Sequence, residues 1–510
     1  MNVPARRRRR VLLINPTITS RRNARFPLAV LSLGTALDGH YDWQLLDGNI
    51  DRDFVATAVK LVESGGFDAV GVTAMGGPQV PSAVAVSKAI RAARPALPII
   101  WGGYFPTICP EPALASPFVD FAVRGQGEST FVELLDAWFG DPQRIGSIPG
   151  LSWRRDGGIV HNADRLFSAA SLAGRPAIER LENPRQYLGH TYLGRHTAGF
   201  QAALGCRFRC TFCGVATMFR GKTALPAAQR LDADLTWLTR EFGVDSINYY
   251  DHNFFDREVD MVPLLEVMAR HQLPWWCFAR SDALVEMSAS TWALVRKSKL
   301  RMAYIGAESP NDRMLHDIRK GTKTDQTLEA VEICRANGVV PELSFMLAPP
   351  EDPEGETENT FRFIRRIKRL HPGTEIMLYI YTPLPPSPHI AGNVHQRVVS
   401  NAAKLRDADG NVLEFPTTAE GWSQPEWVAY WSHTDAPWLS ERLRRRIRDF
   451  TTVLGCRFPT ITDIRSPPMA KRALRALSSW RYRFERYDRP WELDLSRQFV
   501  RLRDPRATGL

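Results

Sequence analysis

Residues 205–214 read GCRFRCTFCG, and this stretch holds three of the seven cysteines in the 510-residue chain. Cys206, Cys210 and Cys213 have the spacing C-x3-C-x2-C and directly follow an apolar run at residues 199–204 that predicts a strand. Thiolates are soft ligands that suit iron–sulfur clusters and zinc. Three of them on one loop can hold three irons of a 4Fe–4S cubane and leave the fourth iron open to a small molecule. The stretch therefore predicts a metal-binding loop at the start of a domain.

Zinc and ordinary structural thiols are the two other interpretations of these cysteines. A structural zinc ion takes four protein ligands, and no fourth cysteine follows nearby, so His196 or His252 would have to complete the site. An odd number of cysteines without an export signal also argues against a disulfide framework. We therefore favour the iron–sulfur cluster. The other cysteines are expected to be core or surface residues: Cys109, Cys277, Cys334 and Cys456.

Apolar strand patterns alternate with helical patterns from residue 199 onward. The predicted strands are Gly199–Leu204, Ser246–Asp251, Trp275–Arg280, Met302–Glu308, Leu343–Leu347 and Glu375–Tyr381. Helical periodicity separates them, for example at residues 227–242, 325–337 and 357–370. Six such βα units suit a partial (β/α)6 barrel of TIM type better than a closed barrel of eight. Its active site is expected at the carboxyl ends of the strands, where the cysteine loop also lies.

The first part of the chain shows a separate alternation of strands and helices. The predicted strands are Val11–Asn15, Trp43–Asp47, Ala69–Ala74 and Pro98–Gly102, with helical patterns such as residues 80–94 between them. This order predicts an α/β domain with a parallel sheet of Rossmann-like, flavodoxin-like type. Ligands of such sheets bind at the carboxyl ends of the strands.

Composition shifts divide the chain into four parts. We expect the Rossmann-like domain at residues 1–145, a linker rich in Gly, Pro and Arg at 146–195, the barrel at 196–390 and a mainly helical region at 391–510. The last region contains several tryptophans, which either line a substrate pocket or, as we slightly favour, pack a helical cap: Trp422, Trp427, Trp431, Trp438, Trp480 and Trp491.

Charge and hydropathy narrow the expected partners and location. The net charge of +11 without a combined basic and aromatic patch gives no support for a nucleic-acid partner. No apolar run reaches the length of a transmembrane segment, and no secretory signal is recognisable. We therefore expect a cytoplasmic protein.

The cysteine loop resembles the signature of the radical S-adenosylmethionine (radical SAM) superfamily, C-x3-C-x-aromatic-C, with Phe212 at the aromatic position. The resemblance implies that the three cysteines hold the catalytic 4Fe–4S cluster. It also implies that the open iron binds S-adenosylmethionine, whose reductive cleavage yields a 5′-deoxyadenosyl radical. Phe212 is expected to contact the adenine.

Polar residues at three other strand ends fit the same family. By the resemblance, Asp251 or Glu308 is expected to pair with the ammonium of S-adenosylmethionine, and Arg280 with its carboxylate. Residues 305–309 (IGAES) resemble the G-x-E-S element of the family. One departure stands at Ala348-Pro349-Pro350, where the family commonly has a glycine-rich turn.

The first domain resembles the cobalamin-binding domain that precedes many radical SAM cores. The family's Ser/Thr-x-Leu element corresponds to Thr73-Ala74-Met75, and 26 residues later follows Gly102-Gly103. By the resemblance, the Thr73 hydroxyl would contact the nucleotide tail, the glycines would let the tail approach the backbone, and Met75 replaces leucine. The D-x-H-x-x-G element of the histidine-ligated relatives is missing, so no histidine is expected below the cobalt.

The resemblance implies an enzyme of the subgroup that includes class B radical SAM methylases and the anaerobic magnesium-protoporphyrin monomethyl ester cyclase. The leading hypothesis is a cobalamin-dependent C-methyltransferase acting on an unactivated carbon of a small molecule. An oxidative cyclase or hydroxylase is the alternative, and a non-catalytic cobalamin or S-adenosylmethionine sensor is a second one. The expected cofactors are a 4Fe–4S cluster, S-adenosyl-L-methionine and cobalamin, and the expected electron donor is of flavodoxin or ferredoxin type.

Overall fold

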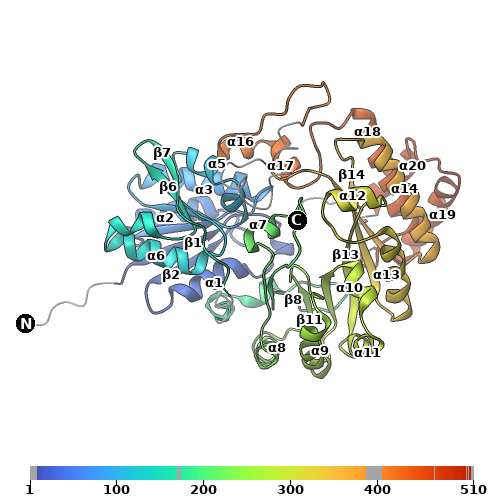
Figure 1. Cartoon of the computed structure of the whole chain (residues 1–510), viewed down its shortest axis with the longest axis horizontal. Coiled ribbons are helices and arrows are strands. Elements are labelled where there is room, and N and C mark those ends of the chain that lie inside the picture. Colours follow the sequence, from blue (N-terminus) through green and yellow to red (C-terminus); the bar gives the residue numbers. More distant parts are fainter. Residues whose placement is uncertain are drawn as a thin grey trace, which may run out of the picture.

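The computed structural model describes residues 8–168, 174–385, 405–464, 466–500, 502 and 505–506. The described strands form two main sheets, one in each half of the molecule (Figure 1). The first sheet has the order β2-β1-β3-β4-β5-β6-β7. Its strands are β1 Arg10–Asn15, β2 Asp42–Asp47, β3 Ala69–Thr73, β4 Ile99–Gly102, β5 Phe121–Val123, β6 Leu151–Arg155 and β7 Gly158–His161.

Helices cover both faces of the parallel strands β1 to β5, as predicted. Val11 and Leu13 of β1 pack with helices α1 (Leu28–Leu37) and α6 (Gly127–Phe139), whereas Leu12 and Ile14 pack with α2 (Phe54–Glu63) and α3 (Gln79–Ala93). A strand that is buried on both faces needs a nearly continuous apolar run, which explains the sequence of β1. The Rossmann-like class expected for this domain is thereby confirmed.

Two strands occupy part of the segment that we expected to be a linker. β6 pairs antiparallel with β5, and β7 pairs antiparallel with β6, so both extend the edge of the first sheet. Arg154 and Arg155 lie on the exposed part of β6. Short, charged edge strands give a weak pattern in the sequence, which is why this hairpin was missed.

The second sheet is fully parallel and open, with the order β15-β14-β13-β12-β11-β8. This arrangement confirms the partial (β/α)6 barrel. Its strands are β8 Thr197–Phe200, β11 Ser246–Tyr249, β12 Trp275–Ala279, β13 Leu300–Glu308, β14 Val340–Leu347 and β15 Glu375–Ile380. The helices between them are α8 Ala228–Phe242, α9 Glu258–His271, α10 Ser281–Glu286, α11 Ala289–Lys297, α12 Asp312–Asp317, α13 Thr324–Ala336 and α14 Pro353–Leu370.

The C-terminal region is helical, as expected, and joins the two halves. Its described helices are α16 Ala419–Trp422, α17 Pro425–Trp431, α18 Glu441–Arg457, α19 Pro468–Arg483 and α20 Trp491–Phe499. Trp422 and Trp431 pack against Phe105 of the first domain, and Trp438 donates to the Ala348 carbonyl at the end of β14. Trp491 is 71% exposed, so the tryptophans do not form one wall. The predicted boundary at residue 390 lies outside the described residues.

The edge of the open barrel is also held by this region. On β15, the Ile380 N–H donates to the His433 carbonyl and the Leu378 N–H donates to the Pro505 carbonyl, at 2.8 Å each. Backbone groups at a free sheet edge need such partners. None of the described helices combines the length and the apolar composition that a membrane crossing needs.

Candidate active site

The cysteine loop leaves the first barrel strand through a short hairpin. β9 (Leu204–Gly205) pairs antiparallel with β10 (Thr223–Ala224). Gly205 has a φ of +82°, and a Cβ on this residue would overlap the Lys222 carbonyl oxygen. Only glycine satisfies both conditions without strain, so the residue before Cys206 fixes the path of the loop.

Contacts from two barrel segments, the loop after β11 and the end of α12, anchor the cysteine loop. The Thr211 N–H donates to the Ile318 carbonyl at 3.0 Å, and the Arg207 guanidinium pairs with the buried Asp256 at 2.7 Å. The Gly205 N–H donates to Nδ1 of His252 at 3.2 Å. Burial lowers the His252 pKa to about 4, so the imidazole is neutral and accepts this bond. His252 therefore positions the cysteine loop through its Nδ1 atom.

The three thiols gather on the inner side of the loop. Each is a free cysteine, and the proximity of Cys210 raises the pKa of both Cys206 and Cys213 after burial, the larger cause. The Cys213 pKa rises to about 12, although nearby backbone N–H groups at the start of helix α7 (Gly214–Phe219) act to lower it. Neighbouring buried thiols resist ionisation unless a cation binds them, and a cationic cluster supplies that charge. The donor set thus fits a three-cysteine 4Fe–4S cluster.

A single metal ion would need a tighter arrangement. Among the residues that the structure describes, no three His, Cys, Asp or Glu side chains form a group that could hold one ion. In a cubane each thiolate binds a different iron.

Glu308, predicted to bind the ammonium, lies at the carboxyl end of β13 beside the loop. Its carboxylate pairs with the buried Lys320 ammonium at 2.7 Å. A bulge after Gly306 gives Glu308 a φ of +60°, a strained conformation for a side chain of this size. A Cβ on Gly306 would overlap both charged groups of the pair. The glycine of the G-x-E-S element therefore makes room for an ion pair that sequence reasoning missed, because Lys320 carries no local signal.

Arg280, predicted to bind the carboxylate, follows β12. Its guanidinium forms a two-pronged ion pair with Asp282 at 2.8 and 3.0 Å and also donates to the Lys320 carbonyl. It stacks on the ring of Phe208 at 3.5 Å from the centroid. Lys320 also faces the Phe212 ring, at 5.9 Å. Strand-end charges and loop aromatics thus lie at one barrel mouth, as the spacing predicted.

Asp251 is held by a backbone hydrogen bond, whereas Glu308 and Arg280 are held by ion pairs. Its Oδ1 accepts the Ala202 N–H at 2.7 Å, between β8 and the cysteine loop. Burial raises its pKa to about 7, partly opposed by the backbone N–H groups.

Ala348, at the family's glycine-rich turn, has a φ of +56°. The unusual turn therefore keeps the backbone shape that glycine normally provides, with an alanine in its place.

The predicted corrin-side residues meet at the carboxyl edge of the first sheet. Thr73 of β3 and Gly102 of β4 are register partners. Gly103 has a φ of +96°, and a Cβ on it would lie 3.0 Å from the Thr73 hydroxyl oxygen. This cradle, which a side chain would fill, suits the passage of a nucleotide tail. Met75 is 49% exposed, and its N–H donates to the Gln79 amide oxygen at 2.8 Å.

The two predicted cofactor regions touch each other through helix α7. Tyr104, the first residue of α4 (Tyr104–Ile108), directly follows Gly103, and its hydroxyl fills the space where a Cβ on Gly214 would lie. At the other end of α7, Arg220 pairs with Asp164, which also pairs with Arg124 of the first domain. Sequence reasoning missed Tyr104, although its place after the double glycine was a usable signal.

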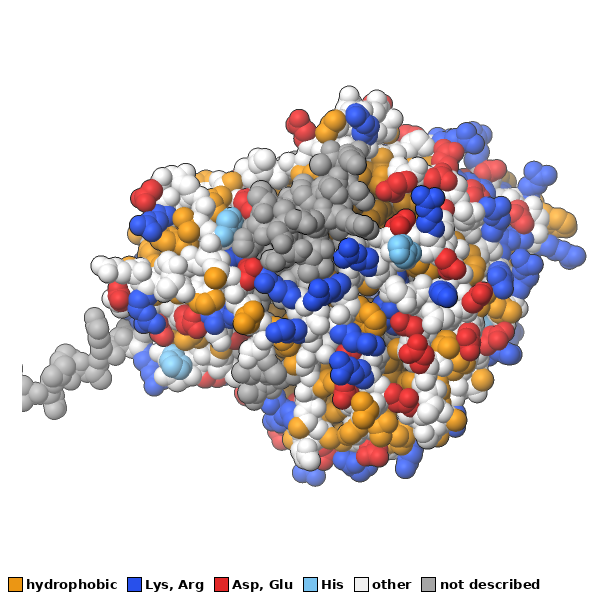
Figure 2. Space-filling model, viewed as in Figure 1, with side chains coloured by type: hydrophobic (Ala, Val, Ile, Leu, Met, Phe, Trp, Pro, Cys, Tyr) orange, Lys and Arg blue, Asp and Glu red, His pale blue; other side chains and the backbone are white. Residues whose placement is uncertain are grey.

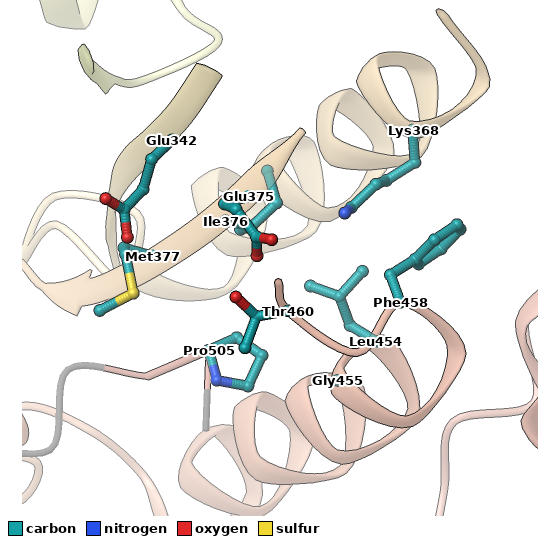
Figure 3. A pocket seen from close by; sticks show the side chains of 10 residues that line it. All are labelled: Glu342, Lys368, Glu375, Ile376, Met377, Leu454, Gly455, Phe458, Thr460 and Pro505. Carbon is teal, nitrogen blue, oxygen red and sulfur yellow. The ribbon is translucent and has the colours of Figure 1, made fainter. Parts of the chain in front are cut away.

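A separate small pocket lies at the opposite, amino-terminal end of β14 and β15 (Figure 3). Glu342, Glu375 and Lys368 project toward it, and α18 closes it with Leu454. Burial lowers the Lys368 pKa to about 8, and its ammonium donates to backbone carbonyls. The pocket is a polar end of the barrel core and is remote from the cysteine loop.

Two domain families match the chain. The B12 binding domain matches residues 15–135, and the radical SAM superfamily matches residues 202–364. These ranges contain the corrin-side residues and the cysteine loop, respectively. The chain is a radical SAM enzyme with a B12-binding domain. Its cofactors are accordingly a 4Fe–4S cluster, S-adenosyl-L-methionine and cobalamin.

Curated relatives of this radical SAM enzyme include proteins of two activities. An uncharacterized methyltransferase of Pyrococcus horikoshii is 24% identical over 367 residues, which are 69% of this chain and 78% of the relative. The anaerobic magnesium-protoporphyrin IX monomethyl ester cyclase of a Synechocystis species is 26% identical over 341 residues, 65% and 67% of the two chains.

Two solved structures share the overall fold of the radical SAM enzyme. The radical S-adenosylmethionine methyltransferase TsrM from Kitasatospora setae, solved with cobalamin and a 4Fe–4S cluster, has a TM-score of 0.61 and 18% identity over 80% of this chain and 82% of TsrM. The cobalamin-dependent radical enzyme OxsB has a TM-score of 0.68 and 13% identity over 94% and 71% of the chains. At these identities the likeness bears on the fold.

Proposed function

We propose that this enzyme transfers a methyl group to an unactivated carbon of a small-molecule substrate. The observation that carries the proposal is the direct contact between the first domain and the cysteine loop, at Tyr104 and Gly214. A B12-binding domain used only as a scaffold would not need its ligand edge against the helix that begins at the third cysteine. The match to a methyltransferase over 78% of that relative supports the same reaction.

The cofactors would supply the difficult chemistry, namely an adenosyl radical from the cluster with S-adenosylmethionine and a methyl group on cobalamin. The chain's residues would hold and shield them. Cys206, Cys210 and Cys213 would bind the cluster. Glu308 and Arg280 would face the amino-acid part of S-adenosylmethionine, and their ion pairs with Lys320 and Asp282 fix both side chains before binding.

Cobalamin would be held by backbone groups of the first domain as much as by its side chains. Thr73, Gly102 and Gly103 would line the tail, and Met75 would lie next to it. The neighbouring strand ends carry an amide network in which Gln79 donates to Asn15 at 3.0 Å. This network occupies the loop after β1, where histidine-ligated relatives have their D-x-H-x-x-G element.

An acidic, flavodoxin or ferredoxin-type protein would deliver the electron, which also implies a reducing, cytoplasmic setting. Lys and Arg side chains gather near the centre of the face in Figure 2, over the part of the barrel next to α7. Exposed basic residues flank the cysteine loop: Arg207, Arg209, Lys222 and Arg319. A positive surface beside a buried cluster raises the encounter rate of an acidic donor.

The test is anaerobic reconstitution with iron, sulfide and cobalamin, followed by turnover with methyl-labelled S-adenosylmethionine and extracts of candidate substrates. We expect absorbance of both cofactors, release of 5′-deoxyadenosine and transfer of the label to a product. Release of 5′-deoxyadenosine with no label in any product would refute methyl transfer while leaving the radical chemistry in place.

The similarity to the magnesium-protoporphyrin ester cyclase supports a second candidate, an oxidative cyclase or hydroxylase. Product mass separates the two reactions, because each methyl transfer adds about 14 mass units and oxygen insertion does not. A sensor without turnover would release no 5′-deoxyadenosine.

A further inference from the structure

Tyr104 is half-buried between the two cofactor regions, and its hydroxyl has been given no chemical role so far. Its hydroxyl lies against Gly214, in the space that a Cβ on that residue would fill. Burial and the nearby Cys213 thiol raise the Tyr104 pKa, so the phenol stays protonated and neutral. The hydroxyl is therefore a fixed dipole next to the cysteine that begins α7.

The backbone of Tyr104 leads directly to the corrin side. A Cβ on Gly103, the preceding residue, would lie 3.0 Å from both the Thr73 hydroxyl oxygen and the Ala74 carbonyl oxygen. The Phe105 N–H, one residue further, donates to that Ala74 carbonyl at 2.9 Å. Any group that enters between Thr73 and Gly103 must move or stiffen the peptide that carries Tyr104.

The Tyr104 ring has a second contact with the same strand end. It meets the Trp431 ring edge to face, with 6.0 Å between centroids at 90°. Trp431 in turn covers Gly76, where a Cβ would overlap the indole nitrogen. The ring thus packs on Trp431, which itself covers the loop after β3, so backbone movement is passed on to the hydroxyl rather than absorbed by side-chain rotation.

We propose that Tyr104 is a positioning residue that couples occupancy of the corrin site to the electronic state of the cluster, through the contact of its hydroxyl with Gly214, the residue after Cys213. The inference rests on the two-cofactor function proposed above. Hydrogen bonds and dipoles near a ligating sulfur tune the reduction potential of an iron–sulfur cluster. Filling the corrin site would thereby prepare the cluster for reduction only when the methyl carrier is present.

The experiment is a redox titration of the reconstituted holoenzyme, followed by electron paramagnetic resonance, with and without hydroxocobalamin. In the native chain, cobalamin should shift the midpoint potential and the g values of the reduced cluster. Tyr104→Phe keeps the ring and removes the hydroxyl, so the shift should fall to about half or less while both cofactors remain bound. By linkage, cobalamin affinity of the native chain should differ between the oxidised and reduced cluster, and this difference should shrink in the variant.

Tyr41→Phe is the matched control, since this buried hydroxyl donates to Asp136 at 2.7 Å within the first domain, away from α7. It should retain the full shift. A native chain whose cluster is unaffected by cobalamin overturns the coupling, even if Tyr104→Phe proves unstable, and so does a variant with an undiminished shift. Failure to bind the cluster or cobalamin at all, seen by absorbance beforehand, would instead refute the proposed function.

Discussion

At the scale of single residues, burial makes the thiols poor ligands until a cluster compensates their charge. Cys213 has its pKa raised to about 12 by burial and by Cys210. Without Cys213, only two of the three cluster ligands remain. We predict that Cys213→Ala loses nearly all reconstituted iron and cluster absorbance. Cys277→Ala, a buried thiol within β12, should keep both and lose only stability. Equal iron content in the two variants would contradict the assignment of the loop.

A substitution at Gly306 tests the role of the Glu308–Lys320 ion pair at the end of β13. A methyl group at this position would overlap the Glu308 carboxylate and the Lys320 ammonium, so Gly306→Ala should separate them. We expect S-adenosylmethionine to bind about tenfold more weakly or worse, a loss of roughly 1.4 kcal/mol, while the cluster is retained. Calorimetry on the reconstituted protein measures the affinity. Gly146→Ala, where a methyl group meets nothing within 4 Å, is the control, and equal affinities would show that the pair has no role in binding.

At the scale of elements, Asp251 ties the end of β11 to the segment between β8 and the cysteine loop, and its contribution to stability depends on pH. Its pKa is raised from 3.8 to about 7, so the folded state favours the protonated form. The stabilisation is complete below about pH 4 and is lost as the pH rises toward 7. Between pH 5 and pH 8 the native chain should therefore lose about 2–3 kcal/mol of unfolding free energy through this residue.

Asp251→Asn removes the titrating proton and should remove that part of the pH dependence. Any pH-independent cost of the amide lowers the unfolding free energy by the same amount at every pH. The informative quantity is therefore the slope of the unfolding free energy against pH. Denaturant unfolding of the cluster-free chain at pH 5, 6, 7 and 8 measures it. Parallel profiles for the native chain and the variant would place the Asp251 pKa near its ordinary value.

Sequence patterns were sufficient for the buried elements. β1 and β13 are buried strands whose apolar runs predicted them, and the strand-end positions of Thr73, Arg280 and Glu308 followed from parallel topology alone. Contacts between distant segments were beyond reach, because nothing local indicates that Lys320 meets Glu308 or that Tyr104 meets Gly214. The bulge at Glu308 was also hidden, since positive φ at a charged residue has no local signature.

At the scale of the whole molecule, helix α7 lies between the carboxyl end of β4, which leads to Tyr104, and the carboxyl end of β11, which leads to His252. This helix is six residues long, yet it contacts the first domain, the segment before the barrel and the barrel itself. Tyr104 reaches its start, Asp164 pairs with Arg220 beyond its end, and His252 packs on Phe219 at 5.0 Å. A shared short element makes both cofactor regions parts of one site rather than two neighbouring sites.

The surface beside α7 and the cysteine loop is basic, and we expect its charge to govern the rate at which an acidic donor protein reduces the cluster. Arg209 and Lys222 are exposed beside the cysteine loop, so Arg209→Glu with Lys222→Glu reverses the local field without touching the buried cluster. We predict about tenfold slower reduction by an acidic flavodoxin at low salt, a gap that closes as salt rises, and unchanged reduction by dithionite. Arg472→Glu with Arg475→Glu, exposed on α19, changes the net charge equally and should reduce normally. Equal slowing by both pairs would mean that overall charge, and no docking surface, sets the rate.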